Sequence, residues 1–229
     1  MSFRFKQFYI EDSKCAMKVG TDGVLLGCWA NPNLTLDIGH LRILDVGTGS
    51  GLIARMMMQR FPEAEVEGID IDEAAVEQAR ENGVQAYVSR LQEWKKEEGY
   101  DLIVSNPPYF QNSLKNPDKG RELARHTDSL SYEELIDHSA RLLREGGQLA
   151  LILPADKEAE MRQIAASKNL FLTHVTRVYS KESKPARRVL LAFRYQISDI
   201  SRTEDTLVLE DEKGERSKAY QELTKDFYL

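Results

Sequence analysis

Residues 42–51 read RILDVGTGSG, and this stretch decides the fold. The apolar run at 42–46 predicts a buried strand, and the three glycines after it predict a turn into a helix over 52–60. A glycine-rich turn after a first strand leaves backbone N–H groups and a helix N-terminus approachable, which suits the polar part of a nucleotide. The stretch therefore predicts a nucleotide-binding α/β fold.

From this stretch onward the chain alternates between strand and helix patterns. Further strands are predicted at 65–70, 86–88, 100–105, 148–153, 170–179 and 188–195, and helices after Asp72, from Ser131 to Gly146-Gly147, and over 156–168. No helix pattern separates the last two strands, so they should pair as an antiparallel hairpin. The expected fold is a doubly wound, seven-stranded, mostly parallel sheet with an antiparallel last strand and a short N-terminal extension.

Composition excludes several classes of protein. The chain has 229 residues, of which 41% are hydrophobic and 30% charged, and no stretch resembles a membrane span or a signal peptide, so we expect a cytoplasmic protein with no membrane partner. Cys15 and Cys28 are the two cysteines, and the four histidines show no ligand spacing. We therefore expect reduced thiols and no metal site, and either a monomer or a weak dimer.

The glycine spacing and two acids indicate which nucleotide cofactor binds. Gly47, Gly49 and Gly51 do not follow the G-x-G-x-x-G pattern of a dinucleotide site. Asp45 beside the turn would repel a pyrophosphate but suits a ligand with an ammonium group, as in S-adenosylmethionine. Asp70 ends the second strand, where an acid commonly accepts hydrogen bonds from two ribose hydroxyls. S-adenosylmethionine is therefore the predicted cofactor, and a nicotinamide-dependent enzyme is disfavoured.

Residues 101–109 read DLIVSNPPY and predict the catalytic centre at the end of the fourth strand. Pro107 and Pro108 stiffen the segment and remove N–H donors. The Asn106 side-chain oxygen and the Pro107 carbonyl can then accept from a planar NH2 group, and Tyr109 offers a face for the ring that carries it. The alternative is a simple proline-rich turn, but Asp45, the glycine turn, Asp70 and this segment should share one crevice.

These motifs resemble those of the bacterial tRNA1(Val) (adenine-37-N6)-methyltransferases, a family of class I S-adenosylmethionine-dependent methyltransferases. The resemblance rests on FKQF (5–8), CAMKVGTDG (15–23), IVSNPPY (103–109), RVLLAF (188–193) and FYL (227–229). It implies N6-methylation of adenosine 37 in valine tRNA, with the anticodon stem-loop as partner, and cofactor contacts from Lys18, Thr21 and Asp22. The family commonly has an acid after the third strand, where this chain has Arg90; adenine recognition then falls to Gln92, to a backbone group or to stacking.

From the patterns along the chain we expect three parts of a single domain. Residues 1–32 form a hairpin and helix extension on the cofactor side, residues 33–198 form the methyltransferase core, and residues 199–229 form an acidic segment and a helix packed on the core.

Charge segregation suggests where RNA would bind. The net charge of −6 argues against non-specific nucleic-acid binding, but residues 181–194 hold five bases and one acid. Lys184, Arg187 and Arg188 are predicted RNA contacts for this reason. Arg121 and Arg125 lie in the polar loop 111–128, which either closes over RNA or is a solvated surface loop.

Other functions remain open at this point. A nucleotide-binding regulator without chemistry is disfavoured by the Asn106–Tyr109 segment. Among methyltransferases, the alternatives are enzymes acting on guanine N2 of ribosomal RNA or on a release-factor glutamine, because the same acceptors serve any planar NH2.

Overall fold

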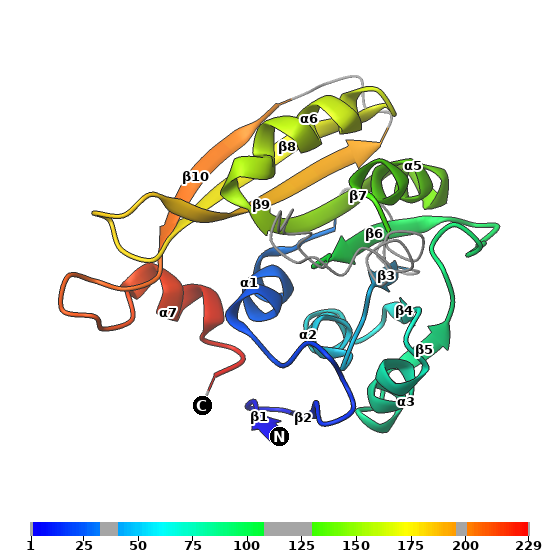
Figure 1. Ribbon diagram of the computed structural model, residues 1–229, viewed down its shortest axis with the longest axis horizontal. Coiled ribbons are helices and arrows are strands. Elements are labelled where there is room, and N and C mark those ends of the chain that lie inside the picture. Colours follow the sequence, from blue (N-terminus) through cyan, green and yellow to red (C-terminus); the bar gives the residue numbers. More distant parts are fainter. Residues whose placement is uncertain (1, 33–40, 108–129, 196–200, 229) are drawn as a thin grey trace, which may run out of the picture.

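The structure is a computed structural model that describes residues 2–32, 41–107, 130–195 and 201–228 (Figure 1). Pro108, Tyr109, Arg121 and Arg125 lie outside the described residues. The elements are, in chain order, β1 (Ser2–Arg4), β2 (Tyr9–Glu11), α1 (Thr21–Trp29), β3 (Arg42–Val46), α2 (Leu52–Arg60), β4 (Glu65–Asp70), α3 (Glu73–Glu81), β5 (Gln85–Val88), β6 (Tyr100–Ser105), α5 (Tyr132–Leu142), β7 (Leu143–Pro154), η2 (Ala155–Lys157), α6 (Glu158–Ala166), β8 (Leu170–Tyr179), β9 (Ala186–Tyr195), β10 (Thr203–Val208) and α7 (Lys218–Thr224).

The main sheet is mostly parallel, as predicted. Its strand order is β10-β8-β9-β7-β6-β3-β4-β5, and β9 runs antiparallel to both β7 and β8. The hairpin expected of the last two core strands is therefore confirmed. Chain order reverses at β3, which lies between β4 and β6, and such a point leaves a crevice at the carboxyl ends of the strands.

The sheet has eight strands, one more than the seven predicted. The additional strand, β10, falls in the acidic segment after residue 199 and pairs parallel to β8. Sequence periodicity missed it because only Leu207 of its six residues is buried. β10 gains its strand structure from the open edge of β8, and an ion pair between Arg177 and Glu204 supports the pairing across the strands.

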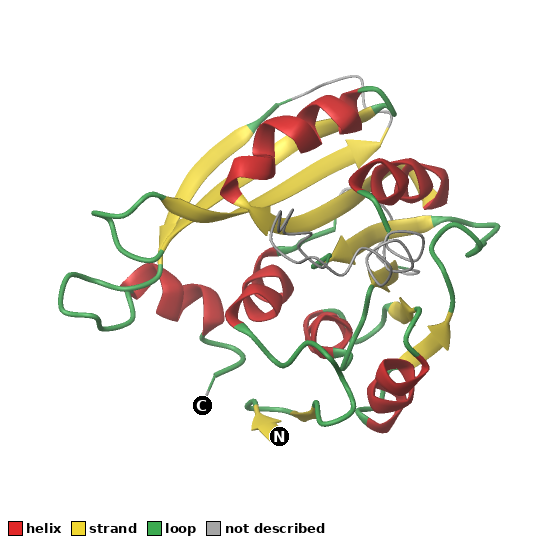
Figure 2. Cartoon of the chain, in the orientation of Figure 1, coloured by secondary structure: helices red, strands yellow, loops and turns green. Residues whose placement is uncertain are grey.

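Helices cover both faces of the sheet (Figure 2). Successive strand residues alternate between two clusters: Ile43 packs with α1, α2 and α3, whereas Leu44 packs with α5 and α6. The helix starts predicted at Asp72 and Ser131 are confirmed, since the Asp72 side chain caps α3 and Ser131 forms a capping box at α5. The predicted end of α5 at Gly146-Gly147 is wrong: the helix ends at Leu142, and β7 already begins at Leu143 beside Tyr100.

The two ends of the chain meet beside α1. A third cluster joins Phe5, Phe8 and Ile10 to α1, to α2 and to Phe227. The Lys6 backbone N–H donates to the Phe227 carbonyl at 2.9 Å. The N-terminal hairpin is thus anchored on the core by apolar packing and by the C-terminal segment that follows α7. Within the described residues, no helix is long and apolar enough to cross a membrane.

Candidate active site

A cleft of about 860 Å³ opens at the carboxyl ends of the central strands. Its walls are the segments that follow β3, β4, β5 and β6, together with residues 15–23 of the N-terminal extension. The strand ends that were expected to share a crevice therefore do so. The described residues contain no group of three or more His, Cys, Asp or Glu side chains suited to a metal ion.

The three glycines after β3 play two different parts. Gly47 and Gly49 line the cleft with φ of +71° and +54°, and a Cβ on either would meet nothing within 4 Å. Gly51 does not line the cleft. A Cβ there would lie 2.7 Å from Val84 Cγ2, so this glycine allows α2 to pack closely against the segment after α3. Two of the predicted glycines thus face open space, and the third serves packing.

Asp70, at the end of β4, holds the glycine turn in place. One carboxylate oxygen accepts from the Gly49 N–H at 2.9 Å, and the other accepts from the Asp72 N–H at 3.0 Å. The side chain is half-buried and lines the cleft. Because a carboxylate oxygen has two lone pairs, each oxygen retains capacity for a ligand hydroxyl.

Asp45 lies beneath the turn and is fully buried. Its Oδ2 accepts from Thr48 Oγ1 at 2.8 Å and from the Ala54 N–H at 3.2 Å, whereas its Oδ1 has no hydrogen-bond partner. Burial raises the pKa of Asp45 to about 7, and the neighbouring Asp70 adds to the rise. Asp45 does not line the cleft, so its predicted contact with an ammonium group stays a prediction.

The end of β6 brings Asn106 and Pro107 to the same cleft. Ser105 is buried, and its hydroxyl donates to the Val46 carbonyl at 2.8 Å, which ties the end of β6 to the end of β3. Asn106 is half-buried, and its Nδ2 lies 3.8 Å from the Met17 sulfur. The amide that the sequence assigned to catalysis therefore opens into the space bounded by the glycine turn.

Comparison with known proteins places this geometry in a family. The Methyltransferase small domain family matches residues 32–178. Proteins of Phocaeicola vulgatus and Bacteroides thetaiotaomicron are 42% and 40% identical to this chain over 99% of its length and 97% of theirs. Both are named tRNA1(Val) (adenine(37)-N6)-methyltransferase. The chain belongs to this methyltransferase family.

Solved structures support the fold of this methyltransferase. A predicted O-methyltransferase of Agrobacterium tumefaciens superposes with a TM-score of 0.68 at 19% identity, covering 90% of this chain and 96% of that one. A putative class I S-adenosylmethionine-dependent methyltransferase of Listeria monocytogenes gives 0.57 at 16% identity, covering 89% and 65%. At these identities the likeness shows the fold alone.

The predicted cofactor contacts in the N-terminal block all line the cleft of the methyltransferase, but two are engaged elsewhere. The Lys18 ammonium donates to the carbonyls of Asp12 and Cys15 at 2.7 and 2.9 Å, so it organises the loop that forms the wall. Asp22 Oδ2 accepts from Arg188 Nε at 2.8 Å. Thr21 is exposed at the start of α1.

Gln92 and Arg90 both line the cleft after β5. Gln92 Nε2 donates to Glu134 Oε1 at 3.1 Å, and Glu134 in turn belongs to the capping box of α5. This bond fixes the amide and leaves its oxygen as the group that can accept from an adenine NH2. Adenine recognition by Gln92 stays a prediction.

The predicted RNA contacts lie in or beside the connection between β8 and β9. Lys184 and Arg187 are exposed, whereas Arg188 is half-buried beside Asp22. The structure thus brings Arg188 to the wall of the cleft, because Asp22 lines it.

Two cleft residues were missed by the sequence reasoning. Met17 and Ile71 line the cleft and are 51% and 55% exposed, which is unusual for large apolar side chains. Ile71 directly follows Asp70. An apolar residue immediately after the acid that ends a strand was therefore the sequence feature that could have identified it. Met17 lies within the CAMKVGTDG block but carried no chemistry of its own in the sequence.

Proposed function

We propose that this protein transfers a methyl group from S-adenosylmethionine to N6 of adenosine 37 in valine tRNA. The observation that carries the proposal is the shared cleft, in which Asn106 and Pro107 meet the glycine turn after β3. The names of the relatives supply the RNA and the position. The cytoplasm, where tRNA is modified, is the proposed location, and the anticodon stem-loop is the proposed partner.

The residues of the cleft fit S-adenosylmethionine. Gly47 and Gly49 face open space that a side chain would fill. Asp45 lies beneath the turn and not in the cleft lining, and its buried Oδ1 has no hydrogen-bond partner. Asp70 retains acceptor capacity for ribose hydroxyls, and Ile71 offers an apolar surface for the adenine ring. Gln92 would accept from the adenine amino group. Bound there, the cofactor supplies an electrophilic methyl group on a sulfonium.

Asn106 and Pro107 would act on the nucleophile. The exocyclic amine of adenine is a poor nucleophile because its lone pair is delocalised into the ring. Hydrogen bonds from the NH2 group to Asn106 Oδ1 and to the Pro107 carbonyl favour a tetrahedral nitrogen whose lone pair points at the methyl group. The nitrogen would bond to the methyl carbon while the sulfur–methyl bond breaks and its electron pair stays on sulfur, and the nitrogen would then lose one proton to water. Asn106 and Pro107 would contribute alignment and electrostatics to this step.

Tyr109 would hold the target base after it leaves its stack, and Pro108 would stiffen the segment. Both residues lie outside the described residues, so their roles rest on the sequence pattern. The same acceptors could hold guanine N2 or a glutamine amide, which leaves the alternative substrates to be tested directly.

The test is methyl transfer from labelled S-adenosylmethionine to total tRNA, ribosomal RNA and release factor in parallel, followed by nucleoside and amino-acid analysis. We expect label in tRNA as N6-methyladenosine, and valine tRNA transcripts with guanosine at position 37 should accept none. Label in ribosomal guanine or in release-factor glutamine would replace the proposed substrate, while retaining the proposed chemistry of the cleft.

A further inference from the structure

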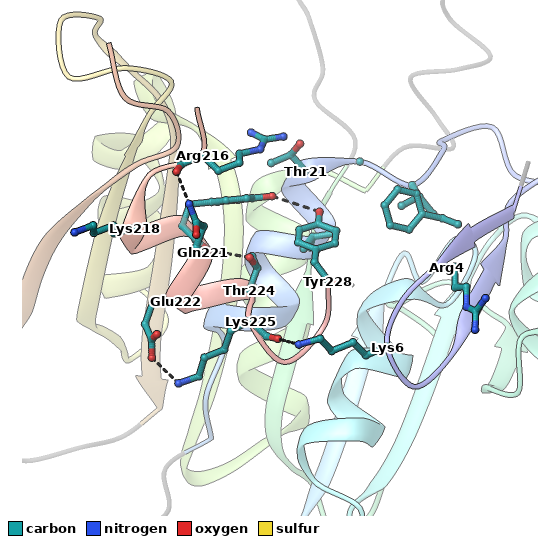
Figure 3. A pocket seen from close by; sticks show the side chains of 15 residues that line it. Arg4, Lys6, Thr21, Arg216, Lys218, Gln221, Glu222, Thr224, Lys225 and Tyr228 are labelled. Atoms are coloured by element: carbon teal, nitrogen blue, oxygen red, sulfur yellow. Dashed lines mark hydrogen bonds and ion pairs between the residues drawn. The ribbon is translucent and has the colours of Figure 1, made fainter. Parts of the chain in front are cut away.

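A second hollow, of about 1110 Å³, lies between the two ends of the chain (Figure 3). We call it the terminal groove. Its walls come from the N-terminal hairpin, the start of α1, the segment before α7, α7 itself and Tyr228. In Figure 3, Tyr228 lies centrally, with Arg216 and Thr21 toward one end and Lys6 and Lys225 toward the other. Lys6, Tyr228 and residues 19–21 belong to sequence blocks named above, but the proposed chemistry assigns no role to this groove.

The terminal groove is basic in an acidic protein. Five of its lining residues are bases and one, Glu222, is an acid. The five bases are Arg4, Lys6, Arg216, Lys218 and Lys225, and all of them are exposed. This excess of positive charge contrasts with the net charge of −6 of the whole chain.

Internal pairing accounts for only part of this charge. Lys225 pairs with Glu222, Lys6 donates to the Lys225 carbonyl, and Arg216 lies 3.5 Å from Glu210. The side chains of Arg4 and Lys218 have no hydrogen bond or ion pair with the described part of the chain. The groove therefore presents cations whose charge the fold does not neutralise.

Aromatic rings lie between these cations. Phe3 is 38% exposed, and its ring centroid is 6.2 Å from that of the half-buried Tyr228. The Tyr228 hydroxyl lies 3.3 Å from that of Tyr220, over whose ring the Arg216 guanidinium packs at 4.8 Å. Of these rings only Phe3 is exposed, and a positively charged groove with an exposed aromatic ring is the arrangement that tracks a single-stranded nucleic-acid backbone and stacks a base.

The terminal groove adjoins the catalytic cleft. Val19, Gly20 and Thr21 line both, so only this short segment leading into α1 separates them. A nucleotide strand whose target base enters the cleft at Asn106 would pass this segment and reach the groove. An acidic peptide would match the positive charge of the groove, but its binding would not be strengthened by the adjoining cleft or by the exposed aromatic ring.

We propose that the terminal groove binds the phosphate backbone of the substrate RNA next to the nucleotide that is methylated. This inference rests on the proposed function and adds a second RNA surface to the predicted one at Lys184, Arg187 and Arg188. Arg4 and Lys218 contact phosphates, and Phe3 stacks with a base. The groove thus selects RNA that extends beyond the target nucleotide.

The test compares two charge reversals, Lys218→Glu in the groove and Lys95→Glu outside it. Both lysines are exposed and have no side-chain partner among the described residues. Lys95 lines neither the groove nor the cleft, and its neighbour Lys96 pairs with Glu65 at the start of β4. A Glu at the first residue of α7 is compatible with the helix, because negative charge is favoured at a helix N-terminus. Tm and S-adenosylmethionine affinity should be unchanged in both variants, which establishes that they fold.

Binding of valine tRNA is then measured across a salt series. We expect Lys218→Glu to weaken binding roughly tenfold and to lower the slope of log K against log salt by about 0.7 to 0.9, while Lys95→Glu changes neither. The KM for tRNA should rise with kcat retained. Adding Arg4→Glu should lower the slope again, and Phe3→Leu should weaken binding without changing the slope.

Each result has a distinct meaning. If Lys218→Glu and the Arg4→Glu double variant bind tRNA with the wild-type affinity and slope, the groove is not an RNA surface, although the proposed function survives. Equal losses in Lys218→Glu and Lys95→Glu would also overturn the inference, because they would reflect net charge alone. A wild-type protein that binds tRNA but methylates none would contradict the proposed function and leave the groove assignment standing.

Discussion

The neighbouring strands β3, β4 and β6 carry buried polar groups on both sides of their midpoints, and the groups on the two sides are paired differently. In the amino-terminal halves of β4 and β6, Glu67 accepts from Lys96 at 2.9 Å and from the Tyr100 hydroxyl at 2.7 Å, and that hydroxyl accepts from Trp94 Nε1 at 2.8 Å. At the carboxyl end of β3, Asp45 is as deeply buried and keeps one oxygen without a partner.

This difference separates polar groups that stabilise the fold from those available to a ligand. A buried group with all its partners is satisfied by the protein itself, and its loss should lower stability. A buried or half-buried group without a full set of partners costs stability in the free protein and is satisfied only when something binds. We therefore expect substitutions at the amino ends to change Tm, and substitutions at the carboxyl ends to change methyl transfer or cofactor binding.

The largest effect should follow Asn106→Ala. The variant loses the proposed acceptor for the target NH2 group, so methyl transfer to tRNA should fall by about 10²- to 10³-fold or more. Affinity for S-adenosylmethionine, measured by calorimetry, should remain within about twofold, because the glycine turn and Asp70 are untouched.

Asn106→Asp is the informative companion, since it keeps an acceptor oxygen and should retain more activity than the alanine variant. Full activity in Asn106→Ala, or a loss of cofactor affinity equal to the loss of turnover, would remove Asn106 from the role of aligning the nucleophile.

Gly49 and Gly51, two residues apart in the glycine turn, give the second comparison. Gly49→Ala places a methyl group in the cleft at a positive φ, so cofactor affinity should fall about tenfold or more, with a loss of stability of about 1–2 kcal/mol from strain. Gly51→Ala meets Val84 at 2.7 Å and should instead lower stability by about 2–3 kcal/mol.

Calorimetry with the cofactor and thermal unfolding of the free protein measure the two effects separately. If both alanine variants lost affinity in proportion to their loss of Tm, the turn would act as a single structural unit, and the distinction between Gly49 and Gly51 would be wrong.

Much of the fold followed from local patterns, and the departures have local causes. The strand 170–179 and the helix 52–60 were predicted with their observed bounds, because buried apolar runs and the 3.6-residue period are intrinsic to their sequences. β10 was missed because its residues are mostly exposed and its structure depends on the edge of β8. No pattern within residues 203–208 records that edge.

The candidate site was predicted less evenly. Asp70 and Asn106 line the cleft as expected, because the backbone position of each, at the end of a strand, is enough to place it there. Lys18 and Asp22 also reached it, but their charged groups are bound to backbone carbonyls and to Arg188, contacts that span elements and leave no trace in spacing. The terminal groove was invisible for the same reason, since it joins residues from the two ends of the chain.

Tyr100→Phe tests the amino end of the sheet. The change removes a hydroxyl that accepts from Trp94 and donates to Glu67, both of which are left with one bond fewer. Stability should fall by about 1–3 kcal/mol, which corresponds to roughly 2–10 °C in Tm for a chain of this size. The rate of methyl transfer at 25 °C should equal that of the wild type. A loss of activity without a loss of Tm would show that this network communicates with the cleft.

The smallest expected effect is the pH dependence that Asp45→Asn removes. Because the folded pKa of Asp45 is raised from its ordinary value to about 7, the folded state binds a proton more readily than the unfolded state. The contribution of Asp45 to stability is therefore greatest below pH 4 and declines as the pH rises to about 7. Asparagine keeps an acceptor for Thr48 and Ala54 but carries no charge, so its Tm relative to wild type should rise by roughly 3–6 °C between pH 5 and pH 8.

The same variant should bind S-adenosylmethionine more weakly if the unpaired oxygen serves the ammonium group. A Tm difference that does not change with pH would mean that the free protein already compensates the Asp45 charge, and the contrast between the two ends of the sheet would then rest on Asn106 and Asp70 alone.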